Sequence, residues 1–147
     1  MKRIEIRDLY KAYQSYEGQE ITLCGWARTV RDSKNIGFIE LNDGAFKSVQ
    51  IVCEREKLAN FDSIVKENVG TSFCVKGKLI VTPNAQQPFE VNATSVEILG
   101  SCELDYPLQK KRHSFEYLRT ISHLRPRTNT FNAVFRVRST LAYAIHK

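Results

Sequence analysis

Strand-like segments dominate the first 100 residues of this chain, and their order restricts the folds that it can adopt. Two of them alternate apolar and polar residues around an Asn-Asp-Gly turn and indicate a hairpin. A helical pattern follows the hairpin, and two more strand-like segments come after it. The five segments are 20–32, the two arms of a hairpin within 31–53, 71–81 and 87–99. This order of three strands, a helix and two strands predicts an all-β fold.

The details of this order indicate a particular barrel. Leu58, Phe61 and Val65 recur at i, i+3 and i+7 and predict the helix between strands three and four. Gly25 interrupts the first strand and indicates a β-bulge. A bulged first strand with a helix between strands three and four is the pattern of the five-stranded OB-fold barrel, which binds oligonucleotides. An N-terminal helix is predicted by Ile6, Leu9, Tyr10 and Tyr13.

The hairpin carries a phenylalanine on the face that is expected to meet solvent. If the hairpin is symmetric about Gly44, Ile39 lies opposite Val49 in the core, and Phe38 lies opposite Gln50 on the outer face. An exposed ring beside a carboxamide suits a single-stranded nucleic acid, because the ring stacks on a base and the amide reads a base edge. An ordinary surface phenylalanine explains the pattern equally well.

The net charge of +6 is confined to the last third of the chain. Residues 1–100 hold 13 of the 22 basic residues and 13 of the 16 acidic residues, so residues 101–147 hold the remaining 9 and 3. A neutral barrel followed by a basic segment is typical of a protein that binds a polyanion, although a solvated basic face has the same composition.

Cysteine usage and hydropathy exclude several classes of protein. The cysteines form no CxxC pair and indicate thiols in a reducing compartment rather than metal ligands. No run approaches the roughly 18 apolar residues of a membrane span, and the charged start of the chain does not fit a signal peptide. We therefore expect a cytoplasmic protein without a membrane partner. The four cysteines are Cys24, Cys53, Cys74 and Cys102.

The basic segment predicts a linker followed by helices. Pro107 lies in the linker, Ser114 is placed to cap a short helix over 115–124, and the stretch RPRTNT ends that helix. A last helix is expected from about Asn132, and its apolar stripe continues to the end without a stop signal. This uncovered stripe predicts a fragment of a larger protein. The stripe consists of Val134, Val137, Leu141 and Ile145.

Two stretches, GWARTVRDSKNIGFIELNDG and DYPLQKKRHSFEYLRTISHLRPRTN, closely resemble the N-terminal region of bacterial asparagine–tRNA ligases, which are class II aminoacyl-tRNA synthetases. The resemblance covers essentially the whole chain. It implies an anticodon-binding OB-fold domain over 1–100, a basic hinge over 101–131, and the start of a truncated catalytic domain over 132–147. It also implies that the catalytic motifs lie beyond this fragment, which then needs no cofactor and has no catalytic residues. The full-length homodimer is expected to use ATP and magnesium.

The resemblance also assigns the residues of the outer face. It implies that Phe38 stacks on the central base of a GUU anticodon, that Gln50 reads this base, and that Glu90 reads the first base. The chemistry of these three side chains agrees, provided that Phe89 and Val91 point inward so that Glu90 points outward. Arg31 is implied as a further anticodon contact, but the sequence leaves its face open because a bulge would shift the alternation.

The remaining candidates lie mostly in the basic segment. The third anticodon base is expected to be read by the loop TPNAQQP, and the hinge cations are expected to contact tRNA phosphates. Trp26 is interpreted as a packing residue. His113 and His123 have no partner at a catalytic spacing and are not assigned to catalysis. The phosphate-binding candidates are Lys110, Lys111, Arg112, Arg119, Arg125 and Arg127.

Three alternatives remain open at this stage. Aspartate and lysine tRNA ligases share the barrel, although the hinge sequence favours asparagine. A free-standing OB-fold protein would bind any single strand, whereas an anticodon reader needs a presented loop. A structural barrel would use Phe38 in a protein interface.

Overall fold

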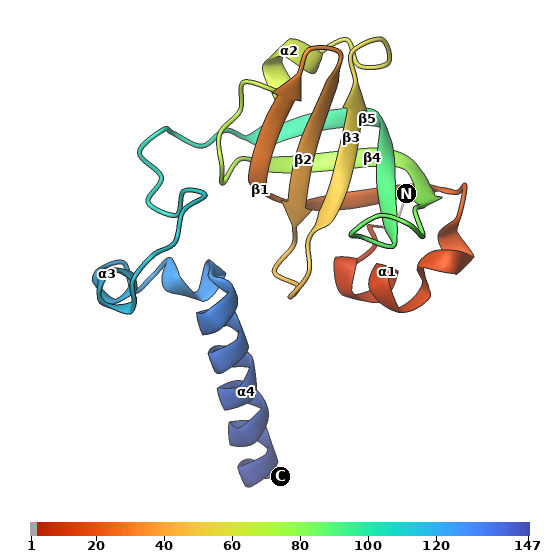
Figure 1. The fold of residues 1–147 in the computed structure, drawn as a ribbon. Helices are drawn as coiled ribbons and strands as arrows, with labels where there is room; N and C mark the ends of the chain where they lie inside the picture. Colours follow the sequence, from red (N-terminus) through yellow and green to blue (C-terminus); the bar gives the residue numbers. More distant parts are fainter. Residues whose placement is uncertain (1–2) are drawn as a thin grey trace. The chain divides into compact units, whose positions relative to one another are not determined.

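The computed structural model describes residues 3–147, which divide into two compact units, one ending at Lys110 and the other beginning at Lys111. The first unit is a β-barrel with short helices (Figure 1). Its helical elements are α1 (Ile6–Ala12), the 3-10 helix η1 (Tyr13–Tyr16) and α2 (Phe61–Ile64). Its strands are β1 (Glu20–Ser33), β2 (Ile36–Asn42), β3 (Val49–Glu54), β4 (Ser72–Val81) and β5 (Phe89–Gly100).

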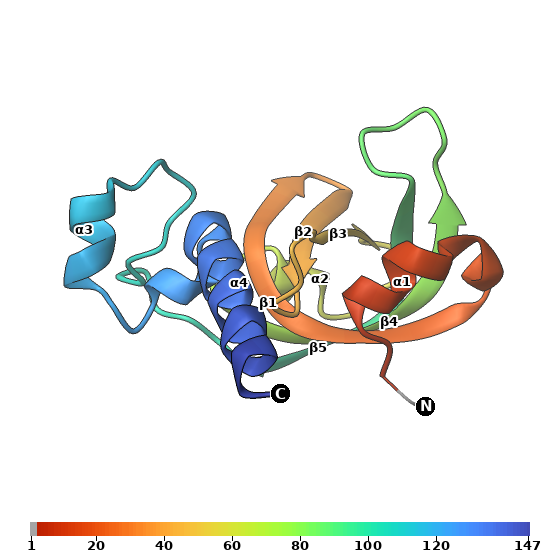
Figure 2. The same cartoon turned by 90° about the horizontal axis from the view of Figure 1, so that it is seen from below.

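The strands close into a barrel in the order β1-β2-β3-β5-β4. Strand β1 is long enough to pair with two neighbours: its first half is antiparallel to β4 and its second half is antiparallel to β2. Its strong curvature is visible in Figure 2. The barrel is completed by a short parallel contact in which Ile51 of β3 pairs with Val91 of β5. The predicted five-stranded OB-fold barrel is therefore confirmed.

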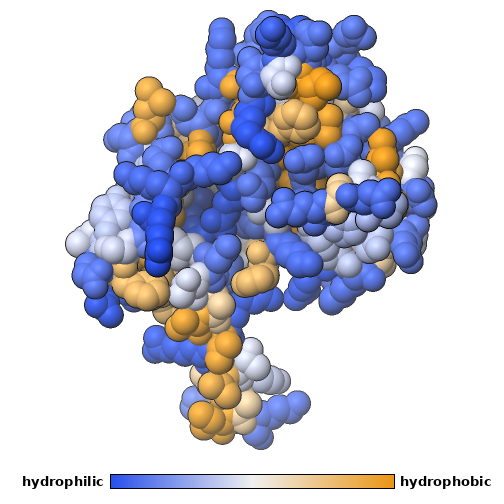
Figure 3. Space-filling view, viewed as in Figure 1, coloured by the Kyte–Doolittle hydropathy of each residue, from blue (hydrophilic) through white to orange (hydrophobic). Residues whose placement is uncertain are grey.

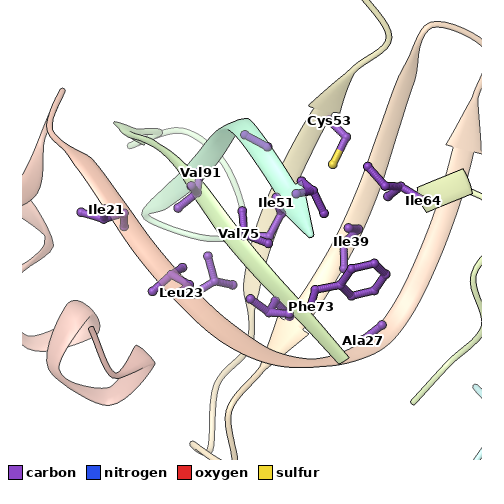
Figure 4. Close-up of a cluster of buried hydrophobic side chains, with 14 of the residues drawn as sticks. Ile21, Leu23, Ala27, Ile39, Ile51, Cys53, Ile64, Phe73, Val75 and Val91 are labelled. Carbon is purple, nitrogen blue, oxygen red and sulfur yellow. The ribbon is translucent and has the colours of Figure 1, made fainter. Parts of the chain in front are cut away.

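One hydrophobic core fills the barrel (Figure 4). Inward side chains from all five strands contribute to it, among them Ile39, Phe73 and Val91. The helices α1 and α2 lie at opposite ends of the barrel (Figures 1 and 2), and α1 buries Ile6 and Leu9 completely. The N-terminal helix therefore belongs to the core, as the helical spacing of its apolar residues predicted.

The predicted helix after β3 is shorter than expected. Only Phe61–Ile64 is helical, and the residues before it form turns, in which the N–H of Leu58 donates to the carbonyl of Glu54 at 3.2 Å. Leu58, Phe61 and Ile64 are nevertheless buried. The apolar spacing thus identified two of the three core residues correctly but overestimated the length of the helix.

The bulge in β1 lies three residues after the predicted glycine. The register between β1 and β2 shifts between Ala27 and Thr29, so Arg28 is the extra residue. Gly25 is required for another reason: a Cβ there would lie 2.6 Å from the carbonyl oxygen of Asn42, which no other residue type could tolerate. In the part of β1 before the bulge, inward and outward side chains alternate, and Trp26 lies on the outer face. The interpretation of Trp26 as a packing residue is wrong, because it is 42% exposed.

The hairpin of β2 and β3 has a wider loop than the sequence suggested. Ile39 pairs with Ile51 and Glu40 pairs with Gln50, so the register predicted from symmetry about Gly44 is wrong by two residues. The side chain of Asn42 causes the difference, since its amide donates to the carbonyls of Ala45 at 3.0 Å and Lys47 at 3.2 Å and so organises a longer loop. A shift of two residues preserves the face of every side chain.

The second unit is helical. Its elements are α3 (Phe115–Thr120), the 3-10 helix η2 (Arg125–Arg127) and α4 (Asn129–His146). Ser114 caps α3 as predicted, because its hydroxyl accepts a hydrogen bond from the N–H of Tyr117 at 3.2 Å. The α3 helix ends earlier than expected, at Thr120, and α4 begins earlier, at Asn129. Within residues 3–147, no helix is long and apolar enough to cross a membrane.

The apolar stripe of α4 is open to solvent, and Figure 3 shows apolar surface along this helix. Its four predicted members are 52–82% exposed. At the start of α4 the unit has a small aromatic cluster, in which Phe131 contacts Phe115 at 5.9 Å and Phe135 at 6.2 Å between ring centroids. The guanidinium of Arg125 lies over Phe131, 5.0 Å from its centroid.

Candidate nucleic-acid interface

The bulge in β1 brings Arg31 to the outer face of the barrel. After the extra residue, Val30 pairs with Ile39 on the core side and Arg31 pairs with Phe38 on the solvent side. The Cζ atom of Arg31 lies 5.6 Å from the centroid of the Phe38 ring, within the range of a cation–π contact. The structure therefore answers the question that the sequence left open about the face of Arg31.

Phe38 and Gln50 also lie on the outer face, although they are not directly opposite each other. Phe38 is opposite Val52, and the position opposite Gln50 is taken by Glu40. Both Phe38 and Gln50 are partly exposed. The predicted faces are thus correct while the predicted pairing is not, and the ring and the carboxamide lie diagonally across the hairpin.

An open hollow of about 450 Å³ lies over this part of the barrel. Arg31, Phe38 and Gln50 line it, together with Gln86 and Gln87 from the loop between β4 and β5. Two cations, Lys47 and Lys110, also contribute to its lining, so three positive side chains surround the hollow and Glu40 is the negative one. This combination of an aromatic face, amide groups and cations suits a base and its phosphate.

Glu90 lies beside this hollow and is joined to it by Gln50. It is partly exposed between Phe89 and Val91, which are completely buried, as predicted. The Nε2 amide of Gln50 donates to the Oε2 atom of Glu90 at 3.2 Å. Glu90 lines a smaller hollow of about 100 Å³, and Gln50 lines both hollows. The four residues proposed from the sequence therefore form one continuous surface.

The loop between β4 and β5 is tied to β3 by a contact that the sequence did not reveal. The backbone N–H of Gln50 donates to the side-chain Oε1 atom of Gln87 at 3.1 Å. Here the parallel pairing of β3 with β5 begins only at the next residue, so Gln87 supplies the acceptor that a neighbouring strand would provide. The only sequence signal for Gln87 was its position in the loop TPNAQQP.

Tyr10 lines the larger hollow beside Lys47 and Ser48. Its hydroxyl donates to the carbonyl of Ser48 at 2.8 Å, and the Nζ atom of Lys47 lies 4.9 Å from its ring centroid. Burial raises the pKa of the Tyr10 hydroxyl, and the nearby Glu40 carboxylate adds to this rise. The hydroxyl therefore stays protonated at neutral pH and keeps its donor role. Sequence reasoning used Tyr10 only to predict the N-terminal helix and did not identify Lys47.

The six predicted phosphate-binding cations fall into different environments. Lys110 lines the hollow of the first unit, whereas the other five belong to the second unit. All except Arg125 are exposed. Arg125 is partly buried against the rings of Phe131 and Phe135, and its Nε atom is buried without a hydrogen bond. Its guanidinium is therefore already engaged in packing.

His113 and His123 belong to no metal-binding cluster in the part of the chain that the structure describes. The ring of His113 stacks on Tyr117 with 5.4 Å between centroids. Among residues 3–147, no group of three or more His, Cys, Asp or Glu side chains is arranged to hold a metal ion.

Residues 21–99 match the family described as the OB-fold nucleic acid binding domain of the tRNA anticodon type. The chain belongs to this family. The matched range runs from β1 to β5 and includes Arg31, Phe38, Gln50 and Glu90. The outer face with its hollows is therefore the surface of an OB-fold domain.

Two curated relatives of this OB-fold chain are asparagine–tRNA ligases. The chain is 62% identical to the asparagine–tRNA ligase of Acetivibrio thermocellus and 57% identical to that of Alkaliphilus oremlandii, each over 148 aligned residues that cover 100% of the chain and 32% of the relative. It thus spans about a third of the length of the curated relatives that it matches. The resemblance to bacterial asparagine–tRNA ligases is confirmed.

Solved structures show the same fold at low sequence identity. Asparaginyl-tRNA synthetase from Pyrococcus horikoshii, complexed with asparaginyl-adenylate, superposes with a TM-score of 0.83 at 22% sequence identity. The match covers 98% of the present chain and 33% of the synthetase chain. Aspartyl tRNA synthetase from Entamoeba histolytica gives a TM-score of 0.81 at 18% identity, covering 95% and 35%. At these identities the likeness establishes the fold alone.

Proposed function

We propose that the outer face of this OB-fold domain binds the anticodon loop of asparagine tRNA, as one part of an asparagine–tRNA ligase. The observation that carries the proposal is the convergence of four side chains from four strands, Arg31, Phe38, Gln50 and Glu90, on one continuous surface with two hollows. The family match and the names of the curated relatives support it.

Each side chain has a role that its chemistry allows. The Phe38 ring stacks on the central uridine of a GUU anticodon, and Arg31 sits beside the ring, where its charge meets a phosphate or base edge. The Gln50 amide offers a donor and an acceptor to uridine. The Glu90 carboxylate accepts from the donors of the first-position guanine, and in the free domain the Gln50 amide occupies one of its oxygens.

The proposal extends to the whole protein. The full-length ligase is a cytoplasmic homodimer that activates asparagine with ATP and magnesium and transfers it to tRNA. Residues 1–100 recognise the anticodon, residues 101–131 form a hinge, and residues 132–147 begin the catalytic domain. The exposed hinge cations contact tRNA phosphates, while Arg125 contributes mainly through packing.

Titrations of anticodon stem-loops test the proposal. The chain should bind a GUU stem-loop more tightly than GUC or UUU stem-loops, which the aspartate and lysine enzymes would favour. It should bind an unstructured oligonucleotide containing GUU at least about tenfold more weakly, because a presented loop has already lost conformational freedom. Equal affinity for all four ligands would show a general single-strand binder. No binding to any of them would favour a structural barrel.

A further inference from the structure

Two of the four cysteines face each other across neighbouring strands of the barrel. Cys24 of β1 and Cys74 of β4 are direct partners in the antiparallel register, and both are free thiols. Both are partly exposed on the outside of the barrel, whereas Cys53 is buried in the core.

The hydrogen-bond ladder shows what kind of pair they form. At one end the N–H of Ala27 donates to the carbonyl of Thr71 at 2.8 Å, and at the other the N–H of Leu79 donates to the carbonyl of Gln19 at 3.2 Å. Both pairs follow the same register as Cys24 and Cys74. Hydrogen-bonded and non-hydrogen-bonded pairs alternate along such a ladder, so the two cysteines occupy a non-hydrogen-bonded position.

This position favours a covalent bridge. In a non-hydrogen-bonded pair the Cα atoms are about 4.5 Å apart and the side chains approach more closely than elsewhere in the ladder. Disulfides span Cα separations of about 4.4 to 6.8 Å, so the two sulfurs can join without separating the strands. Neither Cys53 nor Cys102 is a register partner of another cysteine in the strand pairings of residues 3–147.

We propose that Cys24 and Cys74 form a reversible oxidation site that closes to a cross-strand disulfide. Hydrogen peroxide is the oxidant: it converts one thiol to a sulfenic acid and releases water, and the second thiol then attacks the sulfenic sulfur and releases a second water. Two electrons pass from the two sulfurs to the peroxide, and both thiol hydrogens end in water. A dithiol reductant reverses the bridge by thiol–disulfide exchange.

The surroundings of Cys24 and Cys74 determine how fast their thiols are oxidised. Burial, followed by the neighbouring Cys74 thiol, raises the pKa of the Cys24 thiol, with Glu97 acting in the same direction and Arg3 opposing it. Because the thiolate is the reactive form, oxidation at neutral pH should be slow and should follow prolonged exposure. Burial also raises the pKa of Cys53 to about 12, which protects that thiol.

The bridge would strengthen the barrel and leave the candidate interface open. It would connect β1 to β4 across the 49 residues that lie between Cys24 and Cys74, which restricts the unfolded state strongly. Neither cysteine lines either hollow. The test is therefore chemical and thermal and does not depend on the proposed function.

The experiment treats the 147-residue chain with hydrogen peroxide, digests it without reduction and maps the peptides by mass spectrometry. We expect the Cys24 and Cys74 peptides to be joined with the loss of two hydrogen atoms. We also expect the melting temperature to rise by at least about 5 °C, and dithiothreitol to reverse both changes. Cys102→Ser is the matched control at a partly exposed cysteine and should preserve the bridge.

Cys24→Ser and Cys74→Ser should each abolish both the linked peptide and the thermal shift. A bridge that includes Cys102, or sulfinic and sulfonic acids at Cys24 and Cys74 without a linked peptide, would overturn the proposal. So would a linked peptide whose formation leaves the melting temperature unchanged or lower. Because the mapping is done on the wild-type chain, the proposal stays testable even if a serine variant fails to fold.

Discussion

Replacing Phe38 with alanine separates a binding role from a packing role. A fully buried phenylalanine contributes about 3 to 5 kcal/mol to stability, because its removal leaves a cavity. Phe38 is partly exposed on the outer face, and its neighbours there are Val52 and the guanidinium of Arg31. We therefore expect the substitution to lower the free energy of unfolding by about 1 kcal/mol, of which the cation–π contact supplies about half.

The effect on nucleic-acid binding should be larger than the effect on folding. One base stacked on one aromatic ring contributes about 1 to 3 kcal/mol, which corresponds to a loss of roughly 5- to 150-fold in affinity for the GUU stem-loop. Phe38→Tyr and Phe38→Trp retain a stacking face and should keep most of the affinity. Phe46→Ala is the matched control, because Phe46 is 62% exposed in the adjacent loop and lines neither hollow.

Thermal melts and stem-loop titrations of the same preparations measure the two effects. The melting temperature of Phe38→Ala should fall by no more than about 8 °C, given about 4 to 8 °C per kcal/mol for a domain of this size. A larger fall, with the affinity per folded molecule unchanged, would refute the stacking role and assign Phe38 to packing.

Three further expectations follow from the same surface. Gln87→Ala removes the acceptor for the Gln50 N–H and should weaken stem-loop binding by about fivefold, while lowering the free energy of unfolding by less than about 1 kcal/mol. Unchanged affinity would show that other contacts position the loop between β4 and β5. Replacing residues 110–112 together with alanine should reduce the slope of log affinity against log salt concentration by about 0.7 to 0.9 for each phosphate contact that is lost. As a control, replacing Lys76 and Lys78 on β4 with alanine should leave this slope unchanged. The purified chain should show no asparagine-dependent exchange of pyrophosphate into ATP, and exchange above a mock preparation would contradict the placement of catalysis elsewhere in the protein.

The period-two alternation of the sequence was sufficient to predict the faces of the strands. Phe38, Gln50 and Glu90 all lie on the outer face, as the alternation predicted. An error of two residues in the register between strands does not change the face on which a side chain lies. The register itself depended on the side chain of Asn42, which organises the hairpin loop through contacts that a turn motif does not specify.

Features that depend on three-dimensional pairing were missed. The face of Arg31 is set by the bulge at Arg28, which leaves no local sequence signal. The contact of Gln87 with Gln50 joins residues 37 positions apart, and the pairing of Cys24 with Cys74 requires the register of β1 with β4. Such contacts arise only when the barrel closes.

The most direct measurement of the central claim is a thermodynamic cycle between Gln50 and the middle anticodon base. Stem-loops with GUU and GCU anticodons are titrated into the wild-type chain, Gln50→Ala and the control Gln19→Ala, whose side chain donates to the Ser15 carbonyl and lines neither hollow. We expect the wild-type chain and the control to prefer uridine by about tenfold or more, as one well-placed bidentate contact allows. In Gln50→Ala this preference should fall to about twofold or less, with a smaller loss of affinity for the GCU loop. An unchanged preference for uridine in Gln50→Ala would contradict the claim that this face of the barrel reads the anticodon.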